Sequence, residues 1–168
     1  MNLIFDLDLT LINSSIAEPF RKKRDWQKVY TQIPTFTEYE GMKDVIAYLA
    51  AQKIPYSIVT SSPEPYCKKV CAHWNFSQTY LVTFYDTKNR KPHPDPILLA
   101  MSRMRAEGSD TLSFGDRDID IQASHAAGVK SVACLWGCLD HESLLSANPT
   151  YVIHHPHEII PLIGKVFS

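Results

Sequence analysis

Carboxylates recur in this sequence at spacings that suit the binding of a metal ion. Asp6 and Asp8 stand two residues apart in the run F-D-L-D-L-T, and Asp116 is followed four residues later by Asp120. Carboxylate oxygens are hard ligands, and a site with few carboxylates and several water molecules suits Mg²⁺. We therefore predict that Asp6, Asp8 and Asp116 provide ligands for a magnesium ion, with Asp120 one helical turn beyond Asp116.

Three further residues can bind a phosphate group beside such a cation: Thr60, Ser61 and Lys91. A phosphate dianion is repelled by a group of carboxylates, and both the metal ion and the ammonium group of Lys91 offset that repulsion. Thr60 offers a hydroxyl group, and backbone N–H groups near Ser61, where a helix is predicted to start, point towards an anion. Together these residue types predict phosphoryl chemistry, in which a metal ion stabilises charge on the phosphoryl oxygens.

Each of these signals has a simpler explanation when it is taken alone. An isolated D-x-D is usually a solvated turn or a helix cap, a G-D pair is usually a turn, and a lysine before proline is usually on the surface. Thr-Ser after a strand is most often a helix N-cap. The prediction therefore depends on their combination, because each signal follows a predicted strand.

Apolar runs and helical patterns alternate along the chain, and this order predicts the fold. We expect strands at residues 2–5, 54–60, 79–84, 111–114 and 129–134, with a sixth at 151–153. Helices are expected at residues 41–50, 61–74, 95–104, 119–127 and 158–167. Such alternation predicts a parallel sheet with helices on both faces, in which ligands bind beyond the carboxyl ends of the strands. The polar residues named above should therefore meet at one edge of the sheet.

Length and composition are those of one globular domain. The chain has 168 residues, of which 45% are apolar and 21% are charged. Lys plus Arg number 17 against 18 Asp plus Glu, so the formal charge of −1 gives no general attraction to nucleic acid or to an anionic membrane. No apolar run is long enough to span a bilayer, and Asp6 and Asp8 interrupt the apolar N-terminus, so no signal peptide is expected. We expect a cytoplasmic protein.

Four motifs follow one another in a fixed order: L-I-F-D-L-D-L-T-L, Y-S-I-V-T-S, R-K-P-H-P and L-S-F-G-D-R-D-I-D. With this set the sequence resembles the haloacid dehalogenase-like (HAD) superfamily, and in particular its phosphatase branch, from Met1 to about Cys134 apart from an insertion. The pair D-x-D-x-T and G-D-x-x-x-D is a specific signal, whereas the lysine and threonine motifs are weak alone. The resemblance implies an α/β fold, a three-layer Rossmann-like core with a parallel sheet of strand order 5-4-1-2-3.

The resemblance also implies different roles for the first two aspartates. Asp6 would attack phosphorus and become an aspartyl-phosphate, and Asp8 would protonate the leaving alcohol and then activate water for the second step. A carboxylate nucleophile divides one difficult hydrolysis into two easier displacements. A single acid–base residue can serve both steps by changing its protonation state. The expected activity is Mg²⁺-dependent hydrolysis of a phosphate monoester.

The same resemblance assigns the residues that hold the metal and the phosphate. The implied metal ligands are the Asp6 carboxylate, the Asp8 backbone carbonyl, Asp116 and Asp120, the last bound directly or through a water molecule. Thr60 and Lys91 would hold the phosphoryl group, and Lys91 would also offset the charge on Asp6.

Residues 13–39 form an insertion that the resemblance identifies as a small helical cap within a single domain of residues 1–168. Members of the family often carry a larger cap between the first two motifs. A small cap predicts an open site, which a phosphate on a macromolecule can enter, although we expect a small phosphorylated molecule as the substrate. The basic residues from Arg21 to Arg24, with Lys28, can meet an anionic substrate. A solvated helix face is the simpler interpretation of this basic run.

Four cysteines occur as two pairs, Cys67 with Cys71 and Cys134 with Cys138. Their C-x-x-x-C spacing matches no common zinc motif, so we expect free thiols. The implied strand order places the first pair on one side of the sheet and Cys134 at the other, where a shared metal site is hard to build. The histidine cluster at residues 154–157 is interpreted as a polar turn rather than as a metal site.

Other functions remain compatible with the motifs. A phosphotransferase or phosphomutase would pass the phosphoryl group to a sugar, but it needs a lid that excludes water, for which this insertion is small. A non-catalytic phosphate-binding module would keep the fold without the activity, and the complete set of motif residues argues against it. Dephosphorylation of a protein or of a nucleic acid end is a minor alternative, since the near-neutral charge does not favour nucleic acid. A dehalogenase is not favoured because Asp8 is present.

Overall fold

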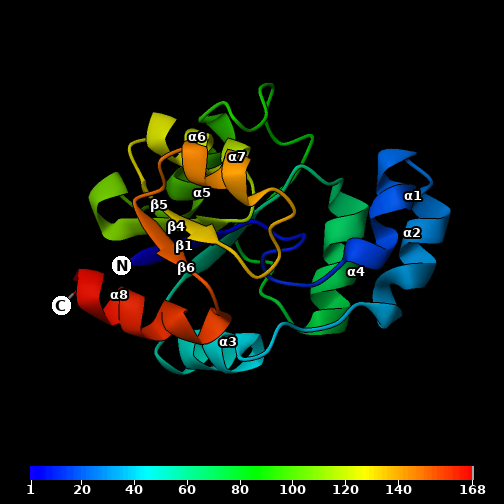
Figure 1. The fold of residues 1–168 in the computed structure, drawn as a ribbon, viewed down its shortest axis with the longest axis horizontal. Coiled ribbons are helices and arrows are strands. Elements are labelled where there is room, and N and C mark those ends of the chain that lie inside the picture. Colours follow the sequence, from blue (N-terminus) through cyan, green and yellow to red (C-terminus); the bar gives the residue numbers. More distant parts are fainter. Residues whose placement is uncertain (168) are drawn as a thin grey trace.

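The computed structural model describes residues 1–167 and has a six-stranded parallel sheet at its centre (Figure 1). The strand order is β3-β2-β1-β4-β5-β6. The strands are β1 (Asn2–Phe5), β2 (Tyr56–Val59), β3 (Leu81–Val82), β4 (Thr111–Gly115), β5 (Lys130–Cys134) and β6 (Tyr151–Ile153). The predicted parallel sheet with order 5-4-1-2-3 is confirmed, and the sixth predicted strand extends it beyond β5.

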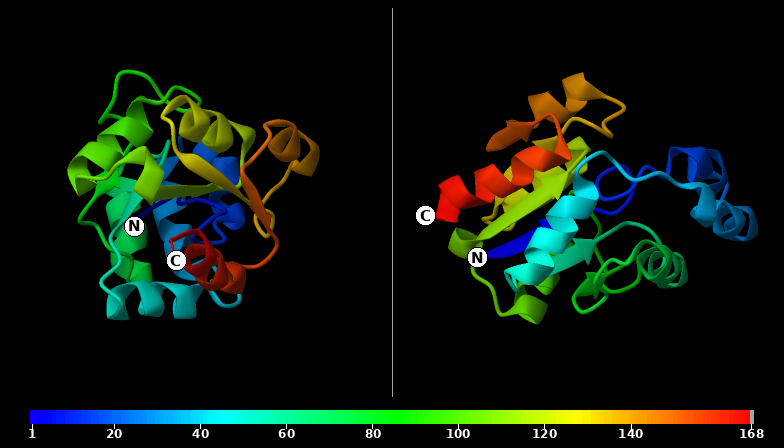
Figure 2. Two further views of the ribbon diagram at one scale, coloured as in Figure 1. Left: turned by 90° about the vertical axis from the view of Figure 1, so that its left-hand side faces the viewer. Right: turned by 90° about the horizontal axis from the view of Figure 1, so that it is seen from below.

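Helices cover both faces of the sheet (Figures 1 and 2). One face carries α3 (Met42–Ala51), α4 (Glu64–Trp74) and α8 (Ile159–Phe167), and the other carries α5 (Asp95–Met104) and α6 (Asp118–Ala126). A further helix, α7 (His141–Ser146), packs beside α6, and single 3-10 turns lie at Gly108–Asp110 and Pro156–Glu158. The longest of these helices, α4, has 11 residues, and none within residues 1–167 is long and apolar enough to cross a membrane.

The two faces of the sheet have separate hydrophobic cores because side chains alternate along each strand. Leu3 and Phe5 point into the core on the side of α3, α4 and α8, whereas Ile4 points into the core on the side of α5. Phe5 stacks on Phe114 of β4 with ring centroids 4.7 Å apart. All four residues of β1 are buried, as expected for a central parallel strand covered on both faces. The ends of β1 and β4 are therefore anchored from both sides.

The third strand is shorter than predicted. The sequence predicts a strand over residues 79–84, but β3 pairs with β2 only through Leu81 and Val82. Asp86 Oδ2 accepts hydrogen bonds from the backbone N–H and the hydroxyl of Thr83, at 2.7 and 2.6 Å. An edge strand has a single neighbour to hold it, so this local turn is enough to end the pairing.

The helix after β2 begins later than predicted, and one short helix is not predicted at all. α4 begins at Glu64 rather than near Ser61, because Pro63 holds an extended backbone before it and no side chain caps its N-terminus. α7 has six residues, too few for a helical period to stand out in the sequence. Its N-terminus is capped by Asp140, whose side chain accepts a hydrogen bond from the Ser143 N–H at 3.0 Å.

Residues 13–39 form a helical insertion beside α4, at the end of the molecule away from both termini (Figures 1 and 2). Its elements are α1 (Glu18–Lys22), α2 (Trp26–Gln32) and single 3-10 turns at Ser15–Ala17 and Ile33–Thr35. Asn13 and Thr37 exchange backbone hydrogen bonds of 3.0 and 3.3 Å, which close the insertion at its base. Trp74 of α4 donates a hydrogen bond from Nε1 to the Ile33 carbonyl at 3.3 Å. The insertion is thus closed at its base and packs against α4.

All four cysteines are free thiols. The strand order places β2, which α4 follows, and β5 on opposite sides of β1 as predicted, yet Cys67 and Cys71 of α4 share one hydrophobic core with Cys134 at the end of β5. The alternation along β5 explains this, because Val132 and Cys134 face the α4 side while Ala133 faces the other side. Burial raises the pKa of these three thiols. Within residues 1–167, no cysteine or histidine belongs to a group of three potential metal ligands.

We expect one of the four thiols to react first with an alkylating reagent. Cys138 lies on the loop after β5 and is partly exposed, whereas Cys67, Cys71 and Cys134 are buried. Iodoacetamide added to the native protein should therefore modify Cys138 before the others, while the denatured protein should react at all four positions. Peptide mass spectrometry over a time course measures this order. Early labelling of Cys67 in the native protein would contradict the observed packing of α4.

Candidate active site

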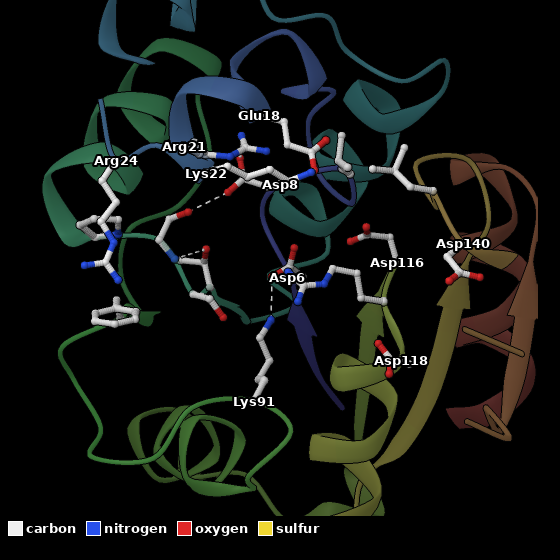
Figure 3. Close-up of a pocket in the computed structure, with 18 of the residues that line it drawn as sticks. Asp6, Asp8, Glu18, Arg21, Lys22, Arg24, Lys91, Asp116, Asp118 and Asp140 are labelled. Atoms are coloured by element: carbon white, nitrogen blue, oxygen red, sulfur yellow. Dashed lines mark hydrogen bonds and ion pairs between the residues drawn. The ribbon is translucent and has the colours of Figure 1, made fainter. Parts of the chain in front are cut away.

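A cavity of about 610 Å³ opens beyond the carboxyl ends of β1, β2 and β4 (Figure 3). Phe5 at the end of β1 pairs with Ile58 of β2 and with Phe114 of β4, so the residues that follow these strands lie side by side. β1 has β2 on one side and β4 on the other, and ligands of α/β sheets bind at such a switch point. The predicted site residues that line the cavity are Asp6, Asp8, Thr60, Ser61, Lys91 and Asp116.

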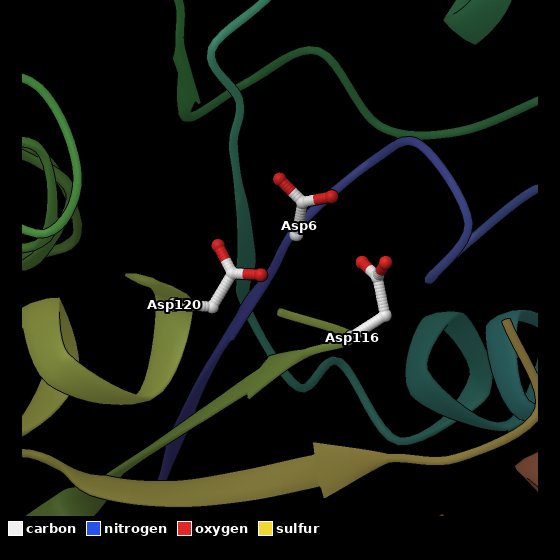
Figure 4. Close-up of side chains that lie close together, drawn as sticks. All are labelled: Asp6, Asp116 and Asp120. Carbon is white, nitrogen blue, oxygen red and sulfur yellow. The ribbon is translucent and has the colours of Figure 1, made fainter. Parts of the chain in front are cut away.

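Asp6, Asp116 and Asp120 form a compact group of carboxylates (Figure 4). One oxygen of each lies within 4.8 Å of the other two. Asp6 follows β1, Asp116 follows β4, and Asp120 lies in the first turn of α6. Gly115 permits this close approach, since a Cβ atom there would lie 2.3 Å from the Cβ of Asp120. The structure thus brings together three of the four residues predicted as metal ligands.

Lys91 lies between two of these carboxylates and is itself buried. Its Nζ is 2.7 Å from Oδ1 of Asp6 and 2.6 Å from Oδ1 of Asp120, and it also donates to the Val59 carbonyl at 3.0 Å. The side chain is only 4% exposed, so water screens these contacts little. Lys91 therefore neutralises part of the negative charge before any ligand binds.

The remaining negative charge shifts the acid–base equilibria of the group. Burial raises the pKa of Asp6 to about 6, with Lys91 opposing this rise and Asp120 adding to it. Burial also raises the pKa of Asp116 to about 8, and repulsion from Asp6 and Asp120 contributes. Burial disfavours the charge on Lys91, yet Asp120 and Asp6 together raise its pKa above the usual range. One lysine thus does not balance three carboxylates, and the group favours a further cation.

The donor set fits a small divalent cation. Oδ1 of the buried Asp120 contacts Lys91 in an ion pair, but it accepts no hydrogen bond of good geometry from any described residue. A buried carboxylate oxygen without a hydrogen bond is available as a ligand. Three carboxylates in a small space supply the oxygen ligands that Mg²⁺ prefers. The side chain of Asp8 is not part of this group, so its contact with a metal through the backbone carbonyl stays a prediction.

Asp8 is held by four donors, two of them from the insertion. Its Oδ1 accepts hydrogen bonds from Ser14 Oγ at 2.7 Å, Arg21 Nη1 at 2.6 Å and Tyr66 OH at 2.5 Å. Its Oδ2 accepts one from Ser62 Oγ at 2.9 Å. The sequence prediction missed these four residues as partners of Asp8. Ser14, Ser62 and Tyr66 lie outside the four motifs, so nothing in the sequence points to a role for them. Arg21 is noticeable only as one member of the basic run.

The basic run is divided between two environments. The side chain of Arg21 is 13% exposed and contacts Asp8, whereas that of Lys22 is 74% exposed and pairs with Glu18 at 2.9 Å. Lys28 is also exposed. The interpretation of this run as a solvated helix face therefore holds for Lys22 and Lys28 and is wrong for Arg21.

Thr60 and Ser61 line the cavity, but they do not lie at a helix N-terminus. Thr60 is buried, and its hydroxyl accepts a hydrogen bond from the Ser62 N–H at 3.1 Å. Ser61 is exposed in the loop before α4. Because α4 begins only at Glu64, the prediction that a helix starts near Ser61 is wrong. A contact of the Thr60 hydroxyl or of this loop with phosphate stays a prediction.

The loop after β5 supports the loop after β1. Thr10 donates a hydrogen bond from its hydroxyl to Oδ1 of Asp116 at 2.9 Å, and Trp136 donates one from Nε1 to the Thr10 carbonyl at 3.0 Å. Leu9 has φ +66°, a left-handed conformation that costs an L residue about 1–2 kcal/mol. A Cβ atom on Gly137 would lie 1.7 Å from the Leu9 carbonyl oxygen, so only glycine permits this contact. Trp136 and Gly137 are not identified from the sequence.

A protein-family model described as haloacid dehalogenase-like hydrolase matches residues 16–134. The chain belongs to this family. The matched region includes Lys91, Asp116 and Asp120, whereas Asp6 and Asp8 precede it. The family resemblance drawn from the four motifs is therefore confirmed.

Two curated relatives are similar in sequence over most of this chain. Phosphoglycolate phosphatase of Pectobacterium atrosepticum is 32% identical over 134 residues, which cover 79% of this chain and 57% of that protein. Phosphoglycolate phosphatase of Escherichia coli (strain K12) is 31% identical over 132 residues, which cover 77% of this chain and 52% of that protein. The chain thus spans about half the length of the curated relatives it matches.

Solved structures show the same fold. A hydrolase from Pseudomonas syringae has a TM-score of 0.81 at 17% identity, with 100% of both chains covered. A HAD-superfamily hydrolase, subfamily IA, variant 1, from Geobacter sulfurreducens has a TM-score of 0.75 at 19% identity, with 96% of this chain and 98% of that chain covered. At these identities the similarity establishes the fold alone.

Gly137→Ala should destabilise the protein, because the new methyl group would collide with the backbone of Leu9. Overpacking of this kind costs about 1–3 kcal/mol, and thermal unfolding followed by circular dichroism measures it. Gly164→Ala is the matched control, since a Cβ atom at Gly164 in α8 meets nothing within 4 Å. The control should unfold at the same temperature as the wild type or higher. A Gly137→Ala variant as stable as the wild type would contradict the close contact between the two loops.

Proposed function

We propose that the protein is a Mg²⁺-dependent phosphatase that hydrolyses a phosphate monoester through an aspartyl-phosphate on Asp6. The position of Asp6 carries this proposal. It lines the cavity, Lys91 lies 2.7 Å from its Oδ1, and Asp116 and Asp120 lie beside it. A carboxylate in this position can face a phosphate ester in the cavity. The charged side chains of Lys91, Asp116 and Asp120 then lie next to the carboxylate that attacks phosphorus. Membership of a hydrolase family supports the same chemistry.

The reaction would proceed in two displacements. In the first, the Asp6 carboxylate attacks phosphorus, the alcohol leaves, and Asp8 gives a proton to the leaving oxygen. In the second, water attacks the phosphorus of the aspartyl-phosphate, Asp8 takes its proton, and phosphate is released from Asp6. Lys91 and the Thr60 hydroxyl both line the cavity and would stabilise charge on the phosphoryl oxygens.

The metal ligands in this proposal are the carboxylates of Asp6, Asp116 and Asp120, with the backbone carbonyl of Asp8. When bound, Mg²⁺ supplies the positive charge that stabilises the phosphoryl oxygens during displacement. Lys91 provides one positive charge beside three carboxylates, which is too little to admit a phosphate dianion without repulsion. The chain contributes the rigid arrangement of three oxygens within 4.8 Å of one another.

The substrate in this proposal is a small phosphorylated molecule. The cavity, at about 610 Å³, has the size of a small-molecule site. Lys22, Arg24 and Arg117 line it and supply positive charge for a second anionic group of the substrate. Two of the curated relatives are named phosphoglycolate phosphatase. Small phosphorylated carboxylic acids are therefore the first compounds to test.

The insertion at residues 13–39 would act as a small cap, within a single domain, over one side of the cavity. Arg21 and Trp26 of the insertion line the cavity, and Tyr85 and Leu139 belong to its lining as well. Tyr85 and Leu139 are 77% and 70% exposed, which leaves this part of the cavity open to solvent. Free access of water favours hydrolysis over transfer to a sugar, and so it argues against a phosphotransferase or phosphomutase.

Asp6→Asn should lower turnover of p-nitrophenyl phosphate in Mg²⁺ by about 10³-fold or more, because an amide cannot replace the nucleophilic carboxylate. Released p-nitrophenolate and phosphate measure the activity. Asp44→Asn is the control, since Asp44 is exposed on α3 and does not line the cavity. Full activity of Asp6→Asn would show that the nucleophile is assigned wrongly. A wild-type protein that binds phosphate and hydrolyses no ester would favour a non-catalytic phosphate-binding module.

Asp116→Asn should weaken Mg²⁺ binding by about tenfold or more. Loss of a residue that only supports a ligand already costs 10- to 100-fold in metal affinity, and Asp116 is proposed as a ligand itself. Isothermal titration calorimetry with Mg²⁺ measures the affinity, again with Asp44→Asn as the control. Equal affinities of the two variants would contradict the proposed metal site.

A further inference from the structure

One arginine of the insertion reaches the carboxylate that handles protons in the proposed reaction. The side chain of Arg21 is 13% exposed and that of Asp8 is 15% exposed, and Nη1 lies 2.6 Å from Oδ1. Lys22, the next residue on α1, is 74% exposed and pairs with Glu18 instead. The Arg21 side chain therefore contributes to a mostly buried ion pair with Asp8 and adds little to the positive charge of the protein surface.

The two oxygens of Asp8 have unequal surroundings. Oδ1 accepts hydrogen bonds from Ser14, Arg21 and Tyr66, and three donors occupy the lone pairs of one carboxylate oxygen. Oδ2 accepts one hydrogen bond from the described residues, given by Ser62 Oγ at 2.9 Å. Oδ2 therefore keeps room for one more hydrogen, and Oδ1 does not.

The guanidinium group of Arg21 joins the donors around Oδ1. Its Nη1 also donates to Ser14 Oγ at 2.7 Å and to Tyr66 OH at 3.2 Å, and its central carbon lies 6.0 Å from the centre of the Tyr66 ring. Asp8, Ser14 and Tyr66 thus share the two hydrogens of one terminal nitrogen, which holds the set in one geometry. Without Arg21, the ordered cluster around Oδ1 loses the member that contacts all the others.

We propose that Arg21 is a positioning residue that orients Asp8 so that Oδ2 exchanges the proton in both steps, an inference that rests on the proposed phosphatase function. In the first step the Asp6 carboxylate bonds to phosphorus, the bond from phosphorus to the leaving oxygen breaks with its electron pair on that oxygen, and a proton moves there from Oδ2. In the second step a water oxygen bonds to phosphorus and a proton of that water moves to Oδ2. The bond from phosphorus to Asp6 then breaks, and its electron pair returns to the carboxylate. Arg21 acts only through Asp8.

Two aryl phosphates with different leaving groups test this proposal on the full chain in Mg²⁺. Phenolate needs a proton in order to leave from phenyl phosphate, whereas 2,4-dinitrophenolate leaves without one. Arg21→Met keeps an apolar stem and removes the guanidinium group. We expect it to lower kcat/KM for phenyl phosphate by about 10- to 100-fold and kcat/KM for 2,4-dinitrophenyl phosphate by less than about threefold, because only the first reaction needs an oriented acid.

Three further variants separate positioning from other roles. Lys23→Met, on an exposed residue after α1 that does not line the cavity, should leave the ratio of the two kcat/KM values unchanged. Arg21→Lys restores the charge on a side chain that is one atom shorter, so it should recover only part of the loss on phenyl phosphate. In an Asp8→Asn background, Arg21→Met should cause no further loss, because its effect passes through Asp8.

Several outcomes would overturn the inference. Equal losses on both substrates would indicate a structural role, and the same loss in the Asp8→Asn background would indicate direct binding of phosphate by Arg21. If circular dichroism shows that Arg21→Met does not fold, Tyr66→Phe removes another donor to Oδ1. It should cause a loss of about two- to tenfold on phenyl phosphate alone, and an equal loss on both substrates would overturn the inference.

The same measurements distinguish this inference from the function on which it rests. A wild-type protein that hydrolyses neither ester would refute the phosphatase function and the inference together. Hydrolysis of both esters that depends on Asp6, without a selective loss in Arg21→Met, would refute the inference alone.

Discussion

Mutual repulsion among Asp6, Asp116 and Asp120 is the constraint on which the surroundings of the cavity depend. Their oxygens lie within 4.8 Å of one another, and Asp116 and Asp120 are buried where water screens charge poorly. Lys91 relieves part of this repulsion from inside the protein. Free side chains would relieve the rest by moving apart. Protonation of Asp116, whose pKa is raised to about 8, relieves more of it, and a rigid backbone beneath the group keeps the three side chains close enough to receive a cation.

This rigidity comes from the close packing of backbone segments, which leaves no room for a side chain at Gly115 or Gly137. β1 and β4 pair along their length and are covered on both faces, so the residues after them start from fixed points. Gly115 brings α6 close enough for Asp120 to join the group, and Gly137 presses on the carbonyl of Leu9. The hydrogen bond from Trp136 to Thr10 completes the support. Residues that touch no ligand thus determine where the carboxylates stand.

The sequence predicts the parts of this site that depend on local signals. Asp6 and Asp116 directly follow apolar runs, so the strand ends that carry them can be predicted from the sequence. The family resemblance supplies the strand order. The partners of Asp8 come from separate segments that meet only through tertiary packing, and a Tyr66 or a serine near a strand end is too common to stand out. The basic run shows the charge of Arg21 but not its burial. β3 and α7 are misjudged because an edge strand and a six-residue helix carry little pattern.

The paired backbone of Asn13 and Thr37 makes the insertion an exchangeable module. The chain leaves the core and returns to it at a single point, and doubling the length of such a loop costs only about 0.6 kcal/mol of closure entropy. Evolution or an engineer can therefore replace these helices by a larger set without rebuilding the sheet. The contact of Arg21 with Asp8 limits that freedom. A replacement insertion must therefore supply its own hydrogen-bond donor to Asp8, even where its other residues are changed to select a different substrate.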